Sequence, residues 1–388
     1  MSVVSNAVGS SDAPQVTRVP IKVKVSSPFL LSLYAIIPLC FLLVLFDYLF
    51  FGNQLRDTYL PKNPATLVIW AIIFNFPHIT SSLITLIDDE YIPFYKKRFT
   101  RVLIAIALFV FTINIAIPLL FPGNFAMVTT ALVFAFYATY TMYHVLSQQF
   151  GIGMIMMKVK SGSASYERWR WLATGGATFM YGMVFGEEYL KMIQLGAHNA
   201  YEVAQVLAAG FIVFATIQGY FLTKQSQRQL GTWYVSSNIA MLIATYALLM
   251  LDYGFFVIAI PRFVHDITAL TIYSVHDQNR NSVKQHNYIY RRLSFLGVPP
   301  LILCTLLAIV VANTVQCGSY LFDSWLGFVS VSECALSHFY TPSTPANPLP
   351  QTMQIWLQIM FICGFFHYHI ESFVWKRDSI HRHAIAFT

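Results

Sequence analysis

Long apolar segments separated by short polar connections recur along the whole chain. A helix needs about 20 apolar residues to cross a bilayer, and ten segments approach or exceed that length, at residues 28–51, 64–89, 101–121, 125–157, 169–186, 201–223, 233–251, 255–279, 294–315 and 352–375. The pattern predicts an all-α polytopic integral membrane protein, a bundle of about ten transmembrane helices. The fifth segment is short and Gly-rich, and the eighth is more polar than the others. Pro77, Pro261 and Pro299-Pro300 are expected to kink their helices rather than end them.

Composition and charge agree with a membrane location. Only 11% of the residues are charged, whereas a soluble domain usually carries about 25%. Of the 24 Lys and Arg residues, 20 fall on one side of the predicted spans. Cytoplasmic loops are enriched in these residues, so both termini are predicted to be cytoplasmic. A bacterial inner membrane is the expected location, and the net charge of +7 sets orientation rather than indicating a nucleic-acid partner. The predicted organisation is a cytoplasmic tail at 1–27, a transmembrane domain at 28–379 with an outer loop at 316–350, and a second cytoplasmic tail at 380–388.

The five cysteines divide between the outer loop and the spans. Cys317 and Cys334 lie in the outer loop, which contains no Lys or Arg, and they either form a disulfide or remain two unpaired thiols. Cys40, Cys304 and Cys363 lie within spans, where they are expected to serve as packing residues.

Histidines inside the predicted spans are the main functional signal. Ionisable residues at membrane depth are costly and normally face a functional interior. Six histidines lie there, and they come from the second, fourth, eighth and tenth spans: His78, His144, His265, His276, His367 and His369. Counted at about 1.5 Å per residue from the cytoplasmic helix ends, all but His276 fall between the bilayer middle and its inner half. The remaining five histidines are expected to be solvated at the surface: His198, His286, His338, His381 and His383.

Polar neighbours share faces with several of these histidines. Gln148 follows His144, and Glu371 follows His367, each at a spacing of four residues that places both side chains on one helix face. Arg262 and Asp266 have the same spacing, so they are expected to neutralise one another beside His265. Asp266 and Asp277 directly follow histidines and therefore point about 100° away from them. His367 and His369 are about 200° apart on a regular helix, so one helix cannot aim both at one ion.

The segment "PRFVHDITALTIYSVHDQNRN" carries two His-Asp pairs, His265-Asp266 and His276-Asp277. The two histidines share a face but stand about 16 Å apart along the helix axis, so a straight helix cannot bring both to one metal. His265 lies at the depth of the other span histidines and is the better ligand candidate. His276 is nearer the cytoplasm, as a ligand of a second centre or as a residue on a route to the surface.

Convergence of histidines from four helices is typical of a metal site in a bundle core. Neutral imidazole suits Fe, Zn and Cu. The alternatives are ordinary hydrogen-bonded packing, a proton relay or substrate site of a transporter, and axial ligation of haem. A non-haem metal centre, with iron as the expected ion, accounts for the pattern best.

Three short patches carry a resemblance to a known family: "FPHITSS" around His78, "YHVLSQQFG" around His144, and "FFHYHIESFVW" around His367 and His369. They resemble the Brp/Blh membrane β-carotene dioxygenases, whose single span histidines come from separate helices. The HxxxH and HxxHH boxes of membrane desaturases and hydroxylases are absent from the sequence. The resemblance implies that His78, His144, His265 or His276, and one of His367 and His369 are iron ligands. It also implies a membrane-soluble polyene or acyl chain as substrate.

The resulting prediction is an integral membrane, iron-dependent oxygenase or oxidoreductase that acts on an apolar substrate drawn from the lipid bilayer. Gln148, Asp266 and Glu371 would hydrogen-bond and orient the imidazoles. A site in the inner half of the membrane also suits a cytoplasmic electron donor. A transporter that relays protons or binds its substrate through the same groups is the competing class, and a structural or assembly factor is the third.

Overall fold

The computed structural model describes residues 17–61, 72–74, 76–121, 124–159, 163–325, 355–376 and 379–388, which are almost entirely helical. The α-helices are α1 (Ser27–Ser32), α2 (Ile36–Phe46), α4 (Phe76–Thr85), α5 (Tyr91–Phe111), α6 (Ile117–Leu120), α7 (Asn124–Met157), α8 (Ala164–Met192), α9 (Ala200–Thr223), α10 (Gln229–Met250), α11 (Gly254–Arg280), α12 (Tyr288–Arg292), α13 (Pro300–Trp325) and α14 (Ile355–Val374). The short helical turns are η1 (Leu33–Ala35), η2 (Asp47–Phe51), η3 (Leu55–Tyr59), η5 (Thr112–Ala116), η6 (Ser294–Leu296) and η8 (His381–Ala384). A small antiparallel hairpin, β1 (Gln194–Leu195) and β2 (His198–Asn199), joins α8 to α9.

Six helices within the described residues are long and apolar enough to cross a membrane, which indicates a multi-pass membrane protein. They are Ser27–Phe51, Tyr91–Leu120, Ala200–Thr223, Gln229–Met250, Gly254–Arg280 and Pro300–Asp323. Each coincides with one of the ten predicted spans. The predicted spans at 125–157, 169–186 and 352–375 are also helical, as α7, α8 and α14, but do not belong to the six. The first part of the predicted span at 64–89 lies outside the described residues, and the helix described within the rest of it is α4.

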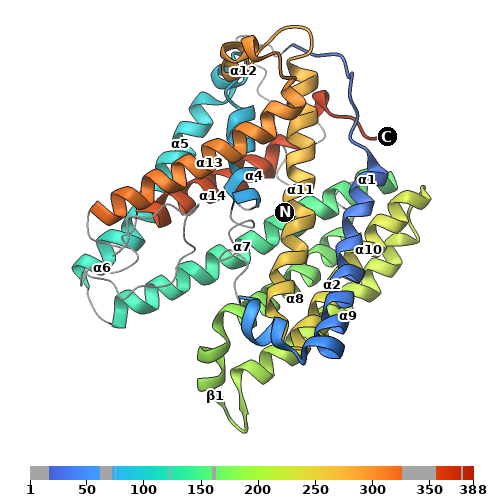
Figure 1. Ribbon diagram of the computed structural model, residues 1–388, viewed down its shortest axis with the longest axis vertical. Coiled ribbons are helices and arrows are strands. Elements are labelled where there is room, and N and C mark those ends of the chain that lie inside the picture. The colour runs from blue at the N-terminus through green and yellow to red at the C-terminus, as the bar shows by residue number, and fades with distance from the viewer. Residues whose placement is uncertain are drawn as a thin grey trace.

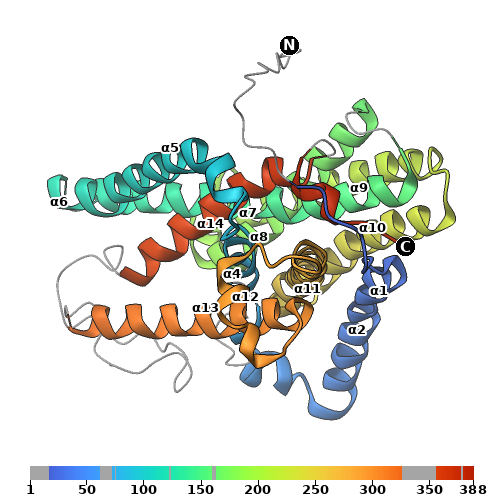
Figure 2. The same cartoon turned by 90° about the horizontal axis from the view of Figure 1, so that it is seen from above.

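Helix α11 forms the centre of the bundle (Figure 1), and Figure 2 shows it nearly end-on. Almost all of its side chains are buried. Helices α4 and α13 pack against one side of it and α10 against another, while α14 packs against α4, α5, α7 and α13. Helix α7 contacts α8, α10, α11 and α14, so it links the two groups of helices. The centre of the molecule is therefore the place where α4, α7, α11 and α14 meet.

Large apolar side chains cover the outer helices. Phe46 on α2, Leu108 on α5 and Phe214 on α9 are all more than half exposed. Extended apolar surface of this kind suits contact with lipid rather than with water.

Prolines have two different effects on the helices, so the prediction of three kinks is wrong in part. Pro261 lies inside α11, which continues past it. Pro77 is the second residue of α4, and Pro300 is the first residue of α13. A proline in the first helical turn lacks only an N–H that has no partner within the helix, so it begins a helix rather than bending one.

The two ends of the described chain are joined to each other. Val25 pairs with Phe387 in a parallel bridge, and its N–H donates to the carbonyl oxygen of Ala386 at 2.8 Å. The side chain of Asn279, at the end of α11, accepts hydrogen bonds from the main-chain N–H groups of Lys22 and Val23 at 2.9 and 2.8 Å. Both terminal segments therefore dock on the same end of α11.

The predicted outer loop at 316–350 begins later than expected. Helix α13 continues to Trp325, ten residues past the predicted end of its span at 315, and residues 326–350 lie outside the described part. Cys317 is disulfide-bonded, and Cys334 lies outside the described residues, so their pairing stays a prediction. Cys40 and Cys304 are buried free thiols, as expected of packing residues.

Candidate metal centre

Four imidazole rings from four helices form a closed ring in the middle of the bundle. They belong to His78 on α4, His144 on α7, His265 on α11 and His367 on α14, and all four side chains are buried. The ring centroids of His78 lie 5.0 Å from those of both His265 and His367. The ring centroid of His144 lies 5.0 Å from the ring centroid of His265 and 4.9 Å from the ring centroid of His367. Each imidazole therefore has two imidazole neighbours, in edge-to-face contact.

The possible ligand atoms approach one another closely enough to surround one ion. One nitrogen from each of His78, His144 and His265 lies within 4.8 Å of the other two. His144, His367 and the carboxylate of Glu371 form a second such group. Since His144 belongs to both groups, we treat the four imidazoles and Glu371 as one centre, called here the four-histidine centre.

The tautomer of His367 follows from hydrogen-bond accounting. The hydroxyl of Ser82 has one proton, and the carbonyl oxygen of Ile79 accepts it at 2.6 Å. The contact of 2.8 Å between Ser82 Oγ and His367 Nδ1 is then donated by the imidazole. This assigns the proton to Nδ1 and leaves the lone pair of Nε2 for the centre, where Nε2 lies 3.8 Å from Glu371 Oε1.

A carboxylate orients His78 in a similar way. His78 Nδ1 lies 3.1 Å from Asp266 Oδ1. Arg262 Nε lies 3.9 Å from the other oxygen of Asp266, so the predicted pairing of Arg262 with Asp266 is present. A carboxylate this close to Nδ1 favours the tautomer with the proton on Nδ1, which presents Nε2 as the ligand atom. Asp266 Oδ1 lies 4.0 Å from Nε2 of the adjacent His265 but only 3.1 Å from Nδ1 of His78 on the neighbouring helix. Asp266 is therefore the closer partner of His78.

Glu371 is held on several sides. Its Oε2 lies 3.4 Å from His144 Nε2 and accepts a 3.4 Å hydrogen bond from Gln148. The hydroxyl of Tyr273, on α11, donates to Oε1. The spacings of Gln148 after His144 and of Glu371 after His367 thus bring both polar groups to the same place, as the sequence predicts.

The ring nitrogens of His265 have no hydrogen-bond partner among the described residues, although both are buried. The same holds for Nε2 of His144 and Nε2 of His367. Buried polar atoms are normally hydrogen-bonded. A neutral imidazole has one lone-pair nitrogen, so His144, His265 and His367 each offer one such atom, and a metal ion would satisfy these.

Two of the six span histidines lie outside the four-histidine centre. His369 points away from His367, as the helical spacing predicts, and its ring packs against Phe373 at 5.4 Å. His276 lies three turns along α11 from His265 and is fully buried. Its Nε2 contacts the hydroxyl of Tyr91 at 3.1 Å, and its ring stacks on that of His381 at a centroid distance of 5.4 Å.

Asp277 contradicts the expectation that it points away from His276. Its Oδ1 lies 2.9 Å from His276 Nδ1, while Oδ2 accepts hydrogen bonds from Thr85 and Tyr290. Adjacent residues differ by about 100° at the Cβ atoms, but a carboxylate and an imidazole can turn toward each other beyond them.

Surface exposure was also predicted wrongly for His286 and His381, which are only 4% and 1% exposed. His286 Nδ1 contacts Asp89 Oδ1 at 2.9 Å. His381 lies under Tyr91, and burial together with the nearby charges of His276 and Arg280 lowers its pKa well below the ordinary value. Both residues belong to segments that fold back onto the end of α11, which hydropathy does not reveal. His198 and His383 are exposed, as predicted, and His338 lies outside the described residues.

Sequence reasoning missed Ser82, Tyr273 and Tyr368. Ser82 lies four residues after His78, and Tyr273 lies eight residues after His265, so both follow a histidine on the same helix face. Tyr368 stacks on the ring of His144 at 4.4 Å. Its position beside His367 carries no periodic signal that points to His144.

Comparisons of the chain with protein-family models, with curated proteins and with solved structures found no match. The functional proposal therefore depends on the geometry of the four-histidine centre.

Proposed function

We propose that the protein is a membrane oxidoreductase with a non-haem metal ion, iron, bound by His78, His144, His265 and His367, with Glu371 as a further ligand. The observation that supports this most directly is the convergence of four buried imidazoles whose ring centroids are about 5 Å apart. Imidazole with one carboxylate suits Fe(II) among the metals available to such a donor set. A porphyrin does not fit between rings this close, so the spacing favours a single ion over haem.

The surrounding residues hold the ligands in one arrangement. Ser82 accepts the Nδ1 proton of His367, and the carboxylate of Asp266 lies 3.1 Å from His78 Nδ1, so both favour the tautomers that present Nε2 to the centre. Tyr273 and Gln148 fix the carboxylate of Glu371. Burial of the centre excludes water, which suits a reaction that water would intercept. A bound iron would supply activation of O₂, and Tyr273 is the nearest group that holds a transferable proton at Glu371.

An apolar, lipid-soluble substrate is part of the proposal. One face of α7 carries Phe136, Tyr140 and Tyr143, whose rings stack in succession at centroid distances of 5.9 and 6.3 Å. Phe136 is 53% exposed on the surface of the bundle, while Tyr140 contacts Tyr368, the residue that stacks on His144. Aromatic side chains thus run from the lipid-facing surface to the centre. The resemblance to the β-carotene dioxygenases points to a polyene or acyl chain as the substrate class.

Elemental analysis of the purified protein tests the proposal. We expect about one iron per chain, and we expect His265→Ala and His367→Ala to lose it, because each variant removes one ligand. His369→Ala is the matched control, since His369 lies two residues along the same helix but outside the centre. It should retain the metal of the wild-type protein.

Two results would contradict the proposal. One is folded wild-type protein that takes up no metal when Fe(II), Zn(II), Mn(II) and Cu(II) are each supplied. The other is equal metal content in His265→Ala, His367→Ala and His369→Ala. Metal-free protein with pH-dependent flux across vesicles would favour the transporter instead, with Asp266, Glu371 and the histidines as a proton relay.

A further inference from the structure

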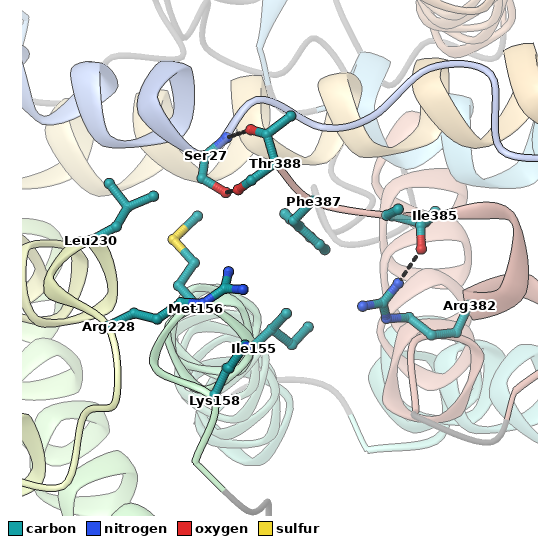
Figure 3. Close-up of a pocket in the computed structure, with 11 residues that line it drawn as sticks. Ser27, Ile155, Met156, Lys158, Arg228, Leu230, Arg382, Ile385, Phe387 and Thr388 are labelled. Atoms are coloured by element: carbon teal, nitrogen blue, oxygen red, sulfur yellow. Dashed lines mark hydrogen bonds between the residues drawn. The ribbon is translucent and has the colours of Figure 1, made fainter.

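A cavity of about 300 Å³ lies well away from the four-histidine centre, where the two chain ends meet. Its wall combines the start of α1 at Ser27, the end of α7, the turn before α10, and the segment from Arg382 to Thr388. We call it the terminal pocket (Figure 3). Three of its lining residues are cations: Lys158, Arg228 and Arg382.

No Asp or Glu side chain lines the terminal pocket. Among the described residues, no carboxylate lies within ion-pairing distance of Lys158, Arg228 or Arg382. Figure 3 shows the guanidinium groups of Arg228 and Arg382 extending into the pocket from opposite sides. Arg382 donates one hydrogen bond to the carbonyl oxygen of Ile385, which fixes its direction and leaves other donors for a ligand. The main-chain oxygen of Thr388 accepts from Ser27 Oγ at 2.8 Å, at the edge of the pocket.

The position of the terminal pocket along the helices indicates its depth relative to the membrane. Two membrane-spanning candidates, Ser27–Phe51 and Gln229–Met250, both begin at its wall. Trp233 lies one turn into the second of them and is 57% exposed. Exposed tryptophans of membrane proteins gather at the level of the lipid headgroups. The pocket therefore lies at the boundary between lipid and water, and it also has apolar lining from Ile155 and Leu230.

We propose that the terminal pocket binds the phosphate group of an anionic amphiphile. Arginine forks match phosphate oxygens in two-point hydrogen bonds, and Arg228 and Arg382 are placed to hold one phosphate between them. Lys158 adds a positive charge, and the apolar residues accommodate the carbon atoms next to the phosphate. The same chemistry suits an acidic phospholipid of the surrounding leaflet and a soluble phosphate ester. The proposal is independent of the metal centre.

Native mass spectrometry of the detergent-solubilised full chain measures this binding directly. Phosphatidylglycerol is titrated against zwitterionic phosphatidylcholine, with glycerol 3-phosphate as a soluble competitor. We expect tighter binding of phosphatidylglycerol to the wild-type protein, and at least about tenfold weaker binding in Arg228→Gln and in Arg382→Gln, because each loses charge-assisted hydrogen bonds. Arg168→Gln is the matched control, since Arg168 is an exposed cation at the start of α8 that does not line the pocket.

Each outcome distinguishes among the possibilities. Loss of phosphatidylglycerol in the two pocket variants, with no competition by glycerol 3-phosphate, identifies a lipid headgroup. Displacement by millimolar glycerol 3-phosphate identifies a soluble phosphate ester. Equal phosphatidylglycerol binding by the wild-type protein, Arg228→Gln and Arg168→Gln would overturn the proposal. The exposed position of Arg228 keeps this test valid even if Arg382→Gln lowers the thermal stability of the fold.

Discussion

Replacement of Ser82 by alanine tests the proton assignment at the four-histidine centre. Ser82 Oγ donates to Ile79 and accepts from His367 Nδ1, so it fixes the imidazole with Nε2 toward the centre. Alanine removes the acceptor, and the ring can then place its proton on Nε2, which cannot bind a metal in that form. Removal of a group that orients a metal-bound histidine typically costs 10–100-fold in metal affinity, roughly 1.4–2.8 kcal/mol.

Competition with a chelator of known affinity measures this loss. Ser81→Ala is a close control, because Ser81 is the adjacent residue, is equally buried and donates to the carbonyl oxygen of His78 at 2.7 Å without contacting a ring nitrogen. We expect its metal affinity to stay within about twofold of the wild-type value, as expected of a group that does not orient a ligand. Equal affinities for Ser82→Ala and Ser81→Ala would refute the assignment of the proton to Nδ1. A weakened affinity in both variants would show that packing of α4, rather than the tautomer, controls the site.

Three further predictions concern stability, each measured by denaturant unfolding in detergent. A Cβ atom at Gly231 would lie 2.5 Å from main-chain atoms of Met157, so Gly231→Ala should destabilise the fold by about 1–3 kcal/mol. Gly210→Ala is the control, because a Cβ atom there would have open space around it. Equal stability of the two variants would contradict the close approach of α7 and α10. Arg280→Met should cost about 3–5 kcal/mol, since it leaves the buried carboxylate of Asp88, which lies 2.9 Å from Arg280 Nε, without its cation. A loss below about 1 kcal/mol would show that this carboxylate is solvated or protonated. Burial raises the pKa of Glu90, but hydrogen bonds from Arg280 and from the N-terminal segment outweigh it and lower the value to about 2. The ionised carboxylate therefore stabilises the fold above about pH 4.5, the stabilisation is lost as the pH falls toward 2, and Glu90→Gln should flatten the unfolding profile across that window.

The sequence predicts the helices that carry the centre, but not how their ends fold. Apolar length and periodicity are local properties, so α7, α11 and α14 appear at the predicted places. The depth of each histidine along its helix is also local, which explains why His78, His144, His265 and His367 converge as expected. His276 and His381 show the opposite case. Their burial results from terminal segments that dock on α11 through Asn279. These contacts join residues 256 and 257 positions apart for the N-terminal segment and 105 positions apart for the C-terminal segment.

The difference between predicted and observed spans has a related cause. Hydropathy measures the composition of a segment, whereas α11 is buried by neighbouring helices and α5 is covered with exposed apolar side chains. A buried helix and a lipid-facing helix can have similar apolar content. The four histidines therefore identify the helices that face the interior of the bundle better than hydropathy does. Ionisable side chains in that interior require polar partners or a ligand.

The energetics of the centre explain why such a cluster persists in an apolar bundle. Four buried ring nitrogens, two on His265 and one each on His144 and His367, have no hydrogen-bond partner among the described residues. Each unsatisfied group costs roughly 1–3 kcal/mol, so together they cost roughly 4–12 kcal/mol. The whole stability of a typical domain is about 5–15 kcal/mol. Ordinary packing histidines avoid that cost by pairing with carbonyls or hydroxyls, as His367 Nδ1 does with Ser82. A metal ion that binds one nitrogen from each of His144, His265 and His367 offsets most of that cost and cross-links α7, α11 and α14, which is why a bound metal accounts for the cluster better than packing does.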